Sequence, residues 1–175
     1  TGTGCNGTNS VVKSIAVSAN SAGSISVEQL KFDIATSSAS ITSMNVVVYD
    51  QNGSVSTSTF GAVINGSAMA SSPTLTYTGG PVIIPANTTY TFKLVGTVTP
   101  AASATNWSVN ATLQGDAQAS TIGSAPLTVG TTTAIANAFT DSGFIWSDNA
   151  TTTAGVSDVD WFNGYQVSGL PSIGL

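Results

Sequence analysis

The sequence has 175 residues, of which 41% are hydrophobic and only 6% are charged, and its formal net charge is −5. Lys13, Lys31 and Lys93 are its only cations, and it contains no His. This balance excludes the basic patch that nucleic acids and anionic membranes require, and the missing His removes the usual base of Ser and Cys hydrolases.

Ser and Thr supply most of the polarity, with 25 Ser and 26 Thr in the chain. Thr, Val and Ile favour pleated strands, whereas helix formers such as Leu, Glu and Arg are scarce, so β-structure is expected. No apolar run of about 18 residues is present, which predicts no membrane insertion. Residues 1–9 are rich in Gly, Thr and Asn and are predicted to be a flexible segment that follows a processed end. The single Cys5 is a cross-link to another chain, a lipid-modified thiol or an unpaired small residue.

The first predicted strand follows this segment. Val11, Ile15 and Val17 alternate with polar residues and are expected to share one face, together with Lys13. A lone cation on an apolar face is typical of a strand that lies near a sheet edge.

The second predicted strand changes phase in its middle. Its apolar residues are odd-numbered at first and even-numbered afterwards: Ile25, Val27, Leu30, Phe32 and Ile34. A slip of one residue reverses the two faces of a strand, so a bulge or a break is predicted near Glu28–Gln29.

Strands and turns continue along the chain. Val46–Val48 is predicted to lie in a strand that is buried on both faces. Two later runs alternate with period two, with apolar faces formed by Tyr90, Phe92 and Leu94 and by Trp107, Val109, Ala111 and Leu113. Turns are expected at Asn52-Gly53, Asn65-Gly66, Pro85–Asn87 and Asn163-Gly164. A short helix is the expectation for Thr133–Phe139.

About ten to twelve short strands at this spacing predict an all-β fold. The expected architecture is an antiparallel β-sandwich, Ig-like or jelly-roll-like, that forms a single domain over residues 10–175.

Acidic residues gather near the end of the chain. Calcium prefers several oxygen ligands, and the candidates for a structural Ca²⁺ are Asp148, Asn149, Asp158 and Asp160. The alternatives are solvated loop carboxylates, or an acid/base pair of Asp158 and Asp160 in a β-rich hydrolase. No cofactor other than calcium is expected.

The same region is aromatic. Trp146, Trp161, Phe162 and Tyr165 are candidates for a carbohydrate-binding platform, or else they pack in the core. Glycosylation sequons are also frequent, and those in predicted turns or on predicted solvent faces are Asn52, Asn65, Asn87, Asn106 and Asn110.

The C-terminal third carries a resemblance. Its FIWSDN element (Phe144–Asn149) and DWFNGYQVSGLP element (Asp160–Pro171) resemble the closing segment of secreted surface proteins from candidate-phyla (Patescibacteria-type) bacteria. Ser24–Asp50 and Ala86–Val98 are also similar to those proteins. The resemblance implies an extracellular, β-rich structural protein of the cell surface, a subunit of a filament or a surface layer.

The expected function is therefore self-assembly without catalysis. Copies of the chain are the expected partner, and glycans are a further candidate. A pilus-like filament could form by donor-strand addition, and Val11, Ile15 and Val17 are the predicted assembly strand. The alternative is a carbohydrate-binding or adhesive module.

Overall fold

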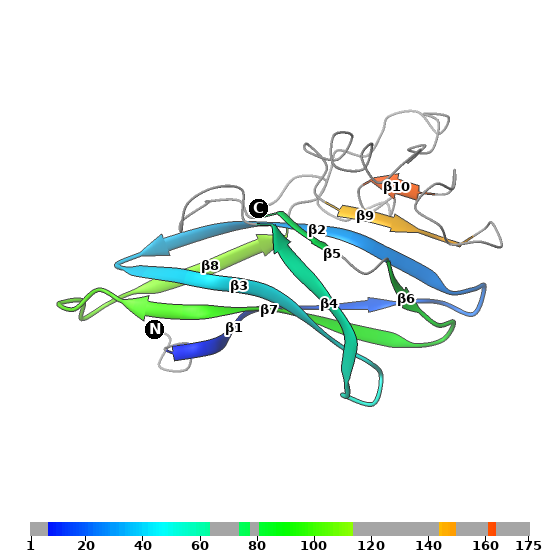
Figure 1. Cartoon of the computed structure of the whole chain (residues 1–175), viewed down its shortest axis with the longest axis horizontal. Helices are drawn as coiled ribbons and strands as arrows, with labels where there is room; N and C mark the ends of the chain where they lie inside the picture. The colour runs from blue at the N-terminus through cyan, green and yellow to red at the C-terminus, as the bar shows by residue number, and fades with distance from the viewer. Residues whose placement is uncertain (1–6, 64–73, 78–80, 114–143, 150–160, 164–175) are drawn as a thin grey trace.

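The computed structural model describes residues 7–63, 74–77, 81–113, 144–149 and 161–163 (Figure 1). Within these ranges every regular element is a β-strand and every ladder is antiparallel. The prediction of an all-β antiparallel fold is confirmed. The described residues contain no helix that is long and apolar enough to cross a membrane. The helix predicted at Thr133–Phe139 lies outside the described residues.

Ten strands follow one another along the described chain. They are β1 (Gly7–Ser18), β2 (Ile25–Ser37), β3 (Ala39–Tyr49), β4 (Val55–Val63), β5 (Thr74–Tyr77), β6 (Val82–Ile84), β7 (Thr89–Pro100), β8 (Ser108–Leu113), β9 (Phe144–Ser147) and β10 (Trp161–Asn163). Several are longer than the short strands predicted, with 13 residues in β2 and 12 in β1 and β7. Because β1 begins at Gly7, residues 7–9 belong to the first strand and not to the flexible segment.

The strands hydrogen-bond in the order β1-β7-β3-β4-β5-β2-β9-β10, while β6 and β8 also pair with β2. β2 therefore pairs with more strands than any other described strand, since it forms ladders with β5, β6, β8 and β9. Figure 1 shows it running the length of the molecule, with β3 and β7 along a separate line below it.

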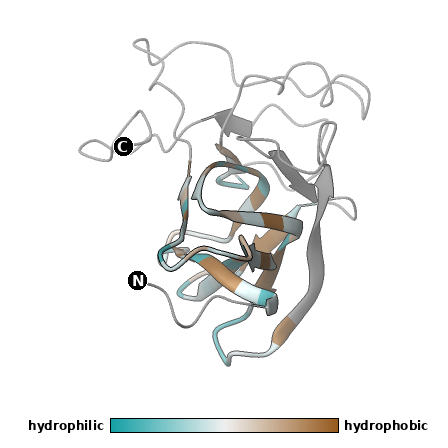
Figure 2. Ribbon diagram, turned by 90° about the vertical axis from the view of Figure 1, so that its left-hand side faces the viewer, coloured by the Kyte–Doolittle hydropathy of each residue, from teal (hydrophilic) through white to brown (hydrophobic). Residues whose placement is uncertain are grey.

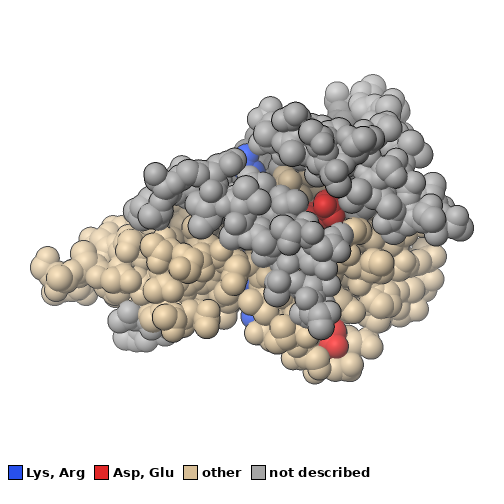
Figure 3. Space-filling model, viewed as in Figure 1, with Lys and Arg blue, Asp and Glu red and all other residues tan. Residues whose placement is uncertain are grey.

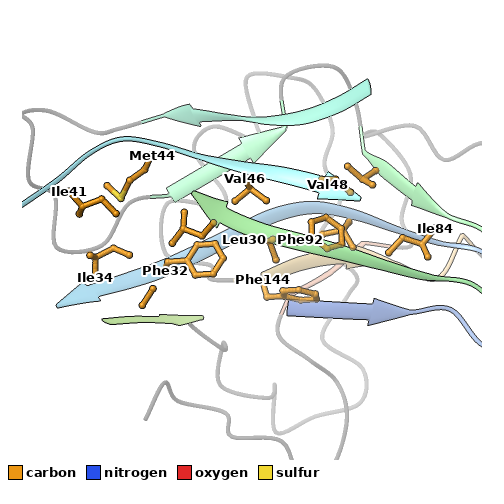
Figure 4. Close-up of a cluster of buried hydrophobic side chains, with 14 of the residues drawn as sticks. Leu30, Phe32, Ile34, Ile41, Met44, Val46, Val48, Ile84, Phe92 and Phe144 are labelled. Carbon is orange, nitrogen blue, oxygen red and sulfur yellow. The ribbon is translucent and has the colours of Figure 1, made fainter. Parts of the chain in front are cut away.

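The core is formed by side chains from several of these strands. The largest fully buried side chains include Leu30 and Phe32 from β2 and Phe92 and Leu94 from β7. Figure 4 shows side chains of β2, β3 and β7 converging on the same space, and Figure 2 shows hydrophobic residues in brown along the described ribbon. The cluster draws on strands far apart in sequence and joins β2, β3, β6, β7, β8 and β9.

Bulges decide which residues face this core. In the ladder between β2 and β9 the register shifts between Val27 and Gln29, which confirms the predicted irregularity near Glu28–Gln29. A second shift, between Thr42 and Asn45 in the β3–β7 ladder, accompanies a positive φ of 52° at Ser43. Each shift restores an apolar face to the core after the alternation changes phase.

Two of the three predictions about strand faces were right, and the third was right only in part. Tyr90, Phe92 and Leu94 share the core-facing side of β7 as predicted, and the apolar residues from Trp107 to Leu113 pack against the core. Val46 and Val48 are fully buried, but Val47 is only partly buried, so β3 is not buried equally on both faces. Val47 lies opposite Lys93, on the side of the sheet away from the core.

The turns between strands use the predicted residues. In the β3–β4 hairpin, the Asn52 and Ser54 amides donate to the Asp50 carboxylate at 2.8 and 2.9 Å, and Gly53 adopts a φ of 75°. Between β6 and β7, Asn87 has a φ of 58° and the Thr88 amide donates to the Pro85 carbonyl at 3.2 Å. Asn65-Gly66 and Gly164 lie outside the described residues.

Candidate functional site

The predicted assembly strand is β1, and the structure places it against β7 of its own chain. From Lys13 to Ser18 the ladder runs without a shift, from Lys13 opposite Leu94 to Ser18 opposite Thr89. The hydroxyls of Ser18 and Thr89 share a hydrogen bond of 2.7 Å at the end of this ladder. β1 is thus an ordinary first strand within the described fold.

The predicted apolar face of β1 needs one correction. Ile15 and Val17 are partly buried and pack against the core, but Val11 is 44% exposed and Val12 packs against the core instead. The reason is a register shift between Val11 and Lys13, which moves Val11 to the opposite side of the sheet. Sequence alternation alone could not locate this bulge, because two adjacent Val residues fit either phase.

β1 is also the terminal strand of the sheet order. β7 pairs with one of its edges, and no strand among the described residues pairs with the other. Its first half is irregular, with a second register shift between Gly7 and Ser10, whereas the stretch from Lys13 to Ser18 is regular. Lys13 lies opposite the buried Leu94. The Lys13 side chain therefore lies on the core-facing side of β1, which is an edge strand.

The predicted calcium ligands are only partly described. Asp148 is exposed, and Asn149 is partly buried with a φ of 52°. Asp158 and Asp160 lie outside the described residues. Among the residues that the structure does describe, no group of three or more His, Cys, Asp or Glu side chains comes together. A structural Ca²⁺ therefore stays a prediction.

Asn149 instead connects β2 to the segment that follows β9. Its Oδ1 accepts a hydrogen bond from the Ser26 hydroxyl at 2.8 Å, and its Nδ2 donates to the Ser24 hydroxyl at 3.0 Å. Its backbone amide donates to the Ser147 hydroxyl at 2.9 Å. Two of these three bonds use the two ends of the side-chain amide, so the described role of Asn149 is to hold the end of β9 against the start of β2.

The aromatic candidates are also placed in part. Trp146 is partly buried and packs against the core, as the packing alternative predicted. In the β9–β10 ladder, Phe162 is the backbone partner of Trp146, and Trp161 is the partner of Ser147. Tyr165 lies outside the described residues. A carbohydrate platform that includes Trp146 would have only the exposed part of this side chain available.

The candidate glycosylation sites that the structure describes are all exposed: Asn52, Asn87, Asn106 and Asn110. Asn110 lies on β8, opposite Ala35 of β2, and points away from the core. Asn65 lies outside the described residues. Exposure makes these positions accessible, and their modification stays a prediction.

Charged side chains are sparse on the described surface. Figure 3 shows isolated Lys and acidic side chains on this face, without a patch of either sign. Lys93 places its Nζ 4.1 Å from the centroid of the Tyr49 ring, on the side of the β3–β7 ladder away from the core. This cation–π contact stabilises the Lys93 ammonium over the face of the Tyr49 ring.

Sequence reasoning missed the functional potential of Glu28. Its side chain is only 5% exposed, and its Oε2 atom is buried without a hydrogen-bond partner. Burial raises the pKa of this carboxyl from 4.5 to about 7. The phase change at Glu28–Gln29 was the available signal, because a bulge can turn a polar residue inward.

Comparisons of the chain with protein-family models, with curated proteins and with solved structures gave no match.

Proposed function

We propose that this chain is a structural extracellular subunit that assembles with copies of itself into a cell-surface filament or a surface layer. The proposed architecture is a single β-sandwich domain, Ig-like or jelly-roll-like, in which β1 supplies the contact between subunits. The proposal includes no catalytic step and no cofactor.

The sandwich is supported by the composition of the core. Fully buried side chains of β2 meet those of β3 and β7, and β1 approaches β8 on one side of the molecule. Two sheets that face each other across a shared core, with their edges close together, are the usual arrangement of a sandwich.

One observation carries the assembly proposal: β1 is the last strand of the sheet, and its regular stretch Lys13–Ser18 has a described partner on one edge only. An antiparallel strand alternates hydrogen-bonding groups between its two edges, so the outer edge of this stretch offers amides and carbonyls to another strand. A second copy can supply that strand by simple edge addition, or it can exchange β1 for its own.

The side chains of β1 favour exchange. Apart from Ser10, none of its residues is fully enclosed, and Ile15 and Val17 are only partly buried. Withdrawing β1 therefore exposes less apolar area than withdrawing β7, which carries Phe92 and Leu94. The low charge of the chain also limits repulsion between closely packed copies.

Electron microscopy of the purified chain over a range of concentrations tests the proposal. Regular polymers are expected, under reducing conditions that exclude a cross-link through Cys5. A chain that lacks residues 1–18 should not polymerise, and a synthetic peptide of residues 7–18 should compete with polymerisation of the whole chain.

The matched control is the same peptide with Ile15 and Val17 replaced by Asp, which should not compete because these two residues pack against the hydrophobic core. Protein that stays monodisperse at every concentration contradicts the proposal. Monodisperse protein that binds glycans would instead support the carbohydrate-binding alternative.

A further inference from the structure

Glu28 occupies a junction at which three ladders of β2 meet. β6 pairs with Ile25–Val27, and β5 pairs with Gln29–Lys31. β9 pairs with residues on both sides of Glu28, but its register shifts between Val27 and Gln29. The β8 ladder begins at Phe32. Glu28 is therefore the one residue from Ile25 to Ser37 that no described ladder pairs.

This unpaired position is closed to solvent. Ser26, Val27, Gln29 and Leu30 on either side of Glu28 are all buried, at 3% exposure or less. The buried Oε2 atom of Glu28 accepts no hydrogen bond. An ionised carboxylate at such a position loses its hydration without compensation, whereas a neutral carboxyl loses much less. The direction of the pKa shift, upward to about 7, agrees with this geometry.

The strands beside Glu28 bring almost no charge to it. β6 (Val82–Ile84) and β9 (Phe144–Ser147) carry no ionisable side chain, and β5 (Thr74–Tyr77) carries only the phenol of Tyr77. The other charged residues of β2 are Lys31 and Asp33, and the exposed Asp148 follows β9. Desolvation is accordingly the cause of the shifted equilibrium.

We propose that Glu28 is a proton-controlled clasp, in which the neutral carboxyl keeps β9, β5 and β6 closed on β2 and loss of its proton loosens β9. The three ladders at this junction are short, with three or four residues in β6, β5 and β9. By contrast, β8 pairs with β2 over six consecutive residues, from Phe32 to Ser37. Opening near Glu28 is therefore expected to release β9 before β8.

The Glu28 clasp opens within one chain, whether or not copies of the chain polymerise. A neutral pH would then loosen the attachment of the C-terminal part of the described fold, and an acidic pH would close it.

The sequence allows a direct test, because Glu28 is the only glutamate in the chain. Labelling with ¹³C-glutamate gives a single side-chain carboxyl signal in NMR, and its chemical shift can be followed with pH in the unmodified protein. A midpoint near 7 is expected. A midpoint near the ordinary value of 4.5 would overturn the proposal.

Hydrogen exchange locates the opening. After correction for intrinsic exchange, the amides of Ile145–Ser147 should lose about tenfold or more of their protection between pH 5 and pH 8. The amides of Val109–Leu113 in β8 are the internal reference and should change less. Equal protection of β9 at both pH values would contradict the clasp.

Two variants complete the experiment. Glu28→Gln keeps the shape of the side chain and removes its proton equilibrium, so the pH dependence of β9 protection should disappear. Asp33→Asn, at an exposed carboxylate of the same strand, should leave it unchanged. If Glu28→Gln does not fold, the titration and the exchange of the unmodified chain still decide the question.

Discussion

Gly96 of β7 lies directly against Ile41 of β3. A Cβ atom built on Gly96 would stand 2.9 Å from both Cγ1 and Cδ1 of Ile41 and 3.2 Å from Cγ of Met44. Gly96 faces the stretch of β3 in which the register shifts between Thr42 and Asn45. The bulge turns both apolar side chains into the core, and the missing side chain of Gly96 leaves the space that they fill.

Replacement of Gly96 by Ala should therefore destabilise the fold. The added methyl group overlaps two branched or long side chains that are already buried, so a loss of about 1–3 kcal/mol in the free energy of unfolding is expected. Urea unfolding measures it. Gly23→Ala is the matched control, since a Cβ there meets nothing within 4 Å, and it should change stability little. Equal effects of the two substitutions would contradict this account of the bulge.

The core between β2 and β7 makes a second prediction. Phe92 is fully buried, whereas Ile83 on β6 is 51% exposed. Phe92→Ala should cost about 3–5 kcal/mol, because it removes a large side chain and leaves a cavity. Ile83→Ala should cost much less. Urea unfolding of both variants checks the assignment of the core, and a small effect at Phe92 would place the core elsewhere.

The hydrogen bonds of Asn149 make a third prediction. Asn149→Gly removes the bonds to Ser24 and Ser26 and still permits the positive φ, so a loss of about 1–2 kcal/mol is expected from thermal or urea unfolding. Asn87→Gly is the control at a second left-handed Asn, one whose side chain is exposed. It should change stability by less than about 0.5 kcal/mol. A double-mutant cycle with Ser26→Ala would assign the coupling to the Asn149–Ser26 bond.

The two faces of β1 make a fourth prediction, about assembly. Ile15 lies opposite the buried Phe92 on the core-facing side, and Ala16 lies opposite Thr91 on the exposed side. Ile15→Asp should abolish polymers because it places a charge against the apolar core, whereas Ala16→Asp should retain them. Electron microscopy reads the outcome, and circular dichroism establishes that each variant is folded. Loss of polymers in Ala16→Asp alone would point to face contacts and not to strand exchange.

Stability should also depend on pH through Glu28. A carboxyl whose pKa is about 7 in the fold, against 4.5 ordinarily, binds its proton more tightly when the chain is folded. The stabilisation is complete below about pH 4.5, falls as the pH rises and is lost above about pH 7. The full difference is about 3 kcal/mol. Urea unfolding at pH 4.5 and pH 7.5 measures it, and the Glu28→Gln variant should show a flatter profile. A stability that rises over this interval in the unmodified chain would show that other groups dominate.

The local sequence pattern was enough to predict β1, β2, β3, β7 and β8 and most of their faces. Tyr90, Phe92 and Leu94 face the core as their spacing predicts, and the change of phase after Val27 marks the bulge of β2. These features depend on residues that are neighbours along the chain, because the side chains of a strand alternate with a period of two. The antiparallel all-β class follows from the same pattern.

Tertiary structure alone decided which strand edges meet and what the bulges bury. The sequence places Val11 and Val12 next to each other, but the ladder with β7 selects Val12 for the core. Nothing local to Glu28 indicates that β5, β6 and β9 close around it, since these partners lie from about 50 to 120 residues further along the chain. Alternation is set by the geometry of one strand, whereas the burial of a charge is set by strands that pair across long stretches of sequence.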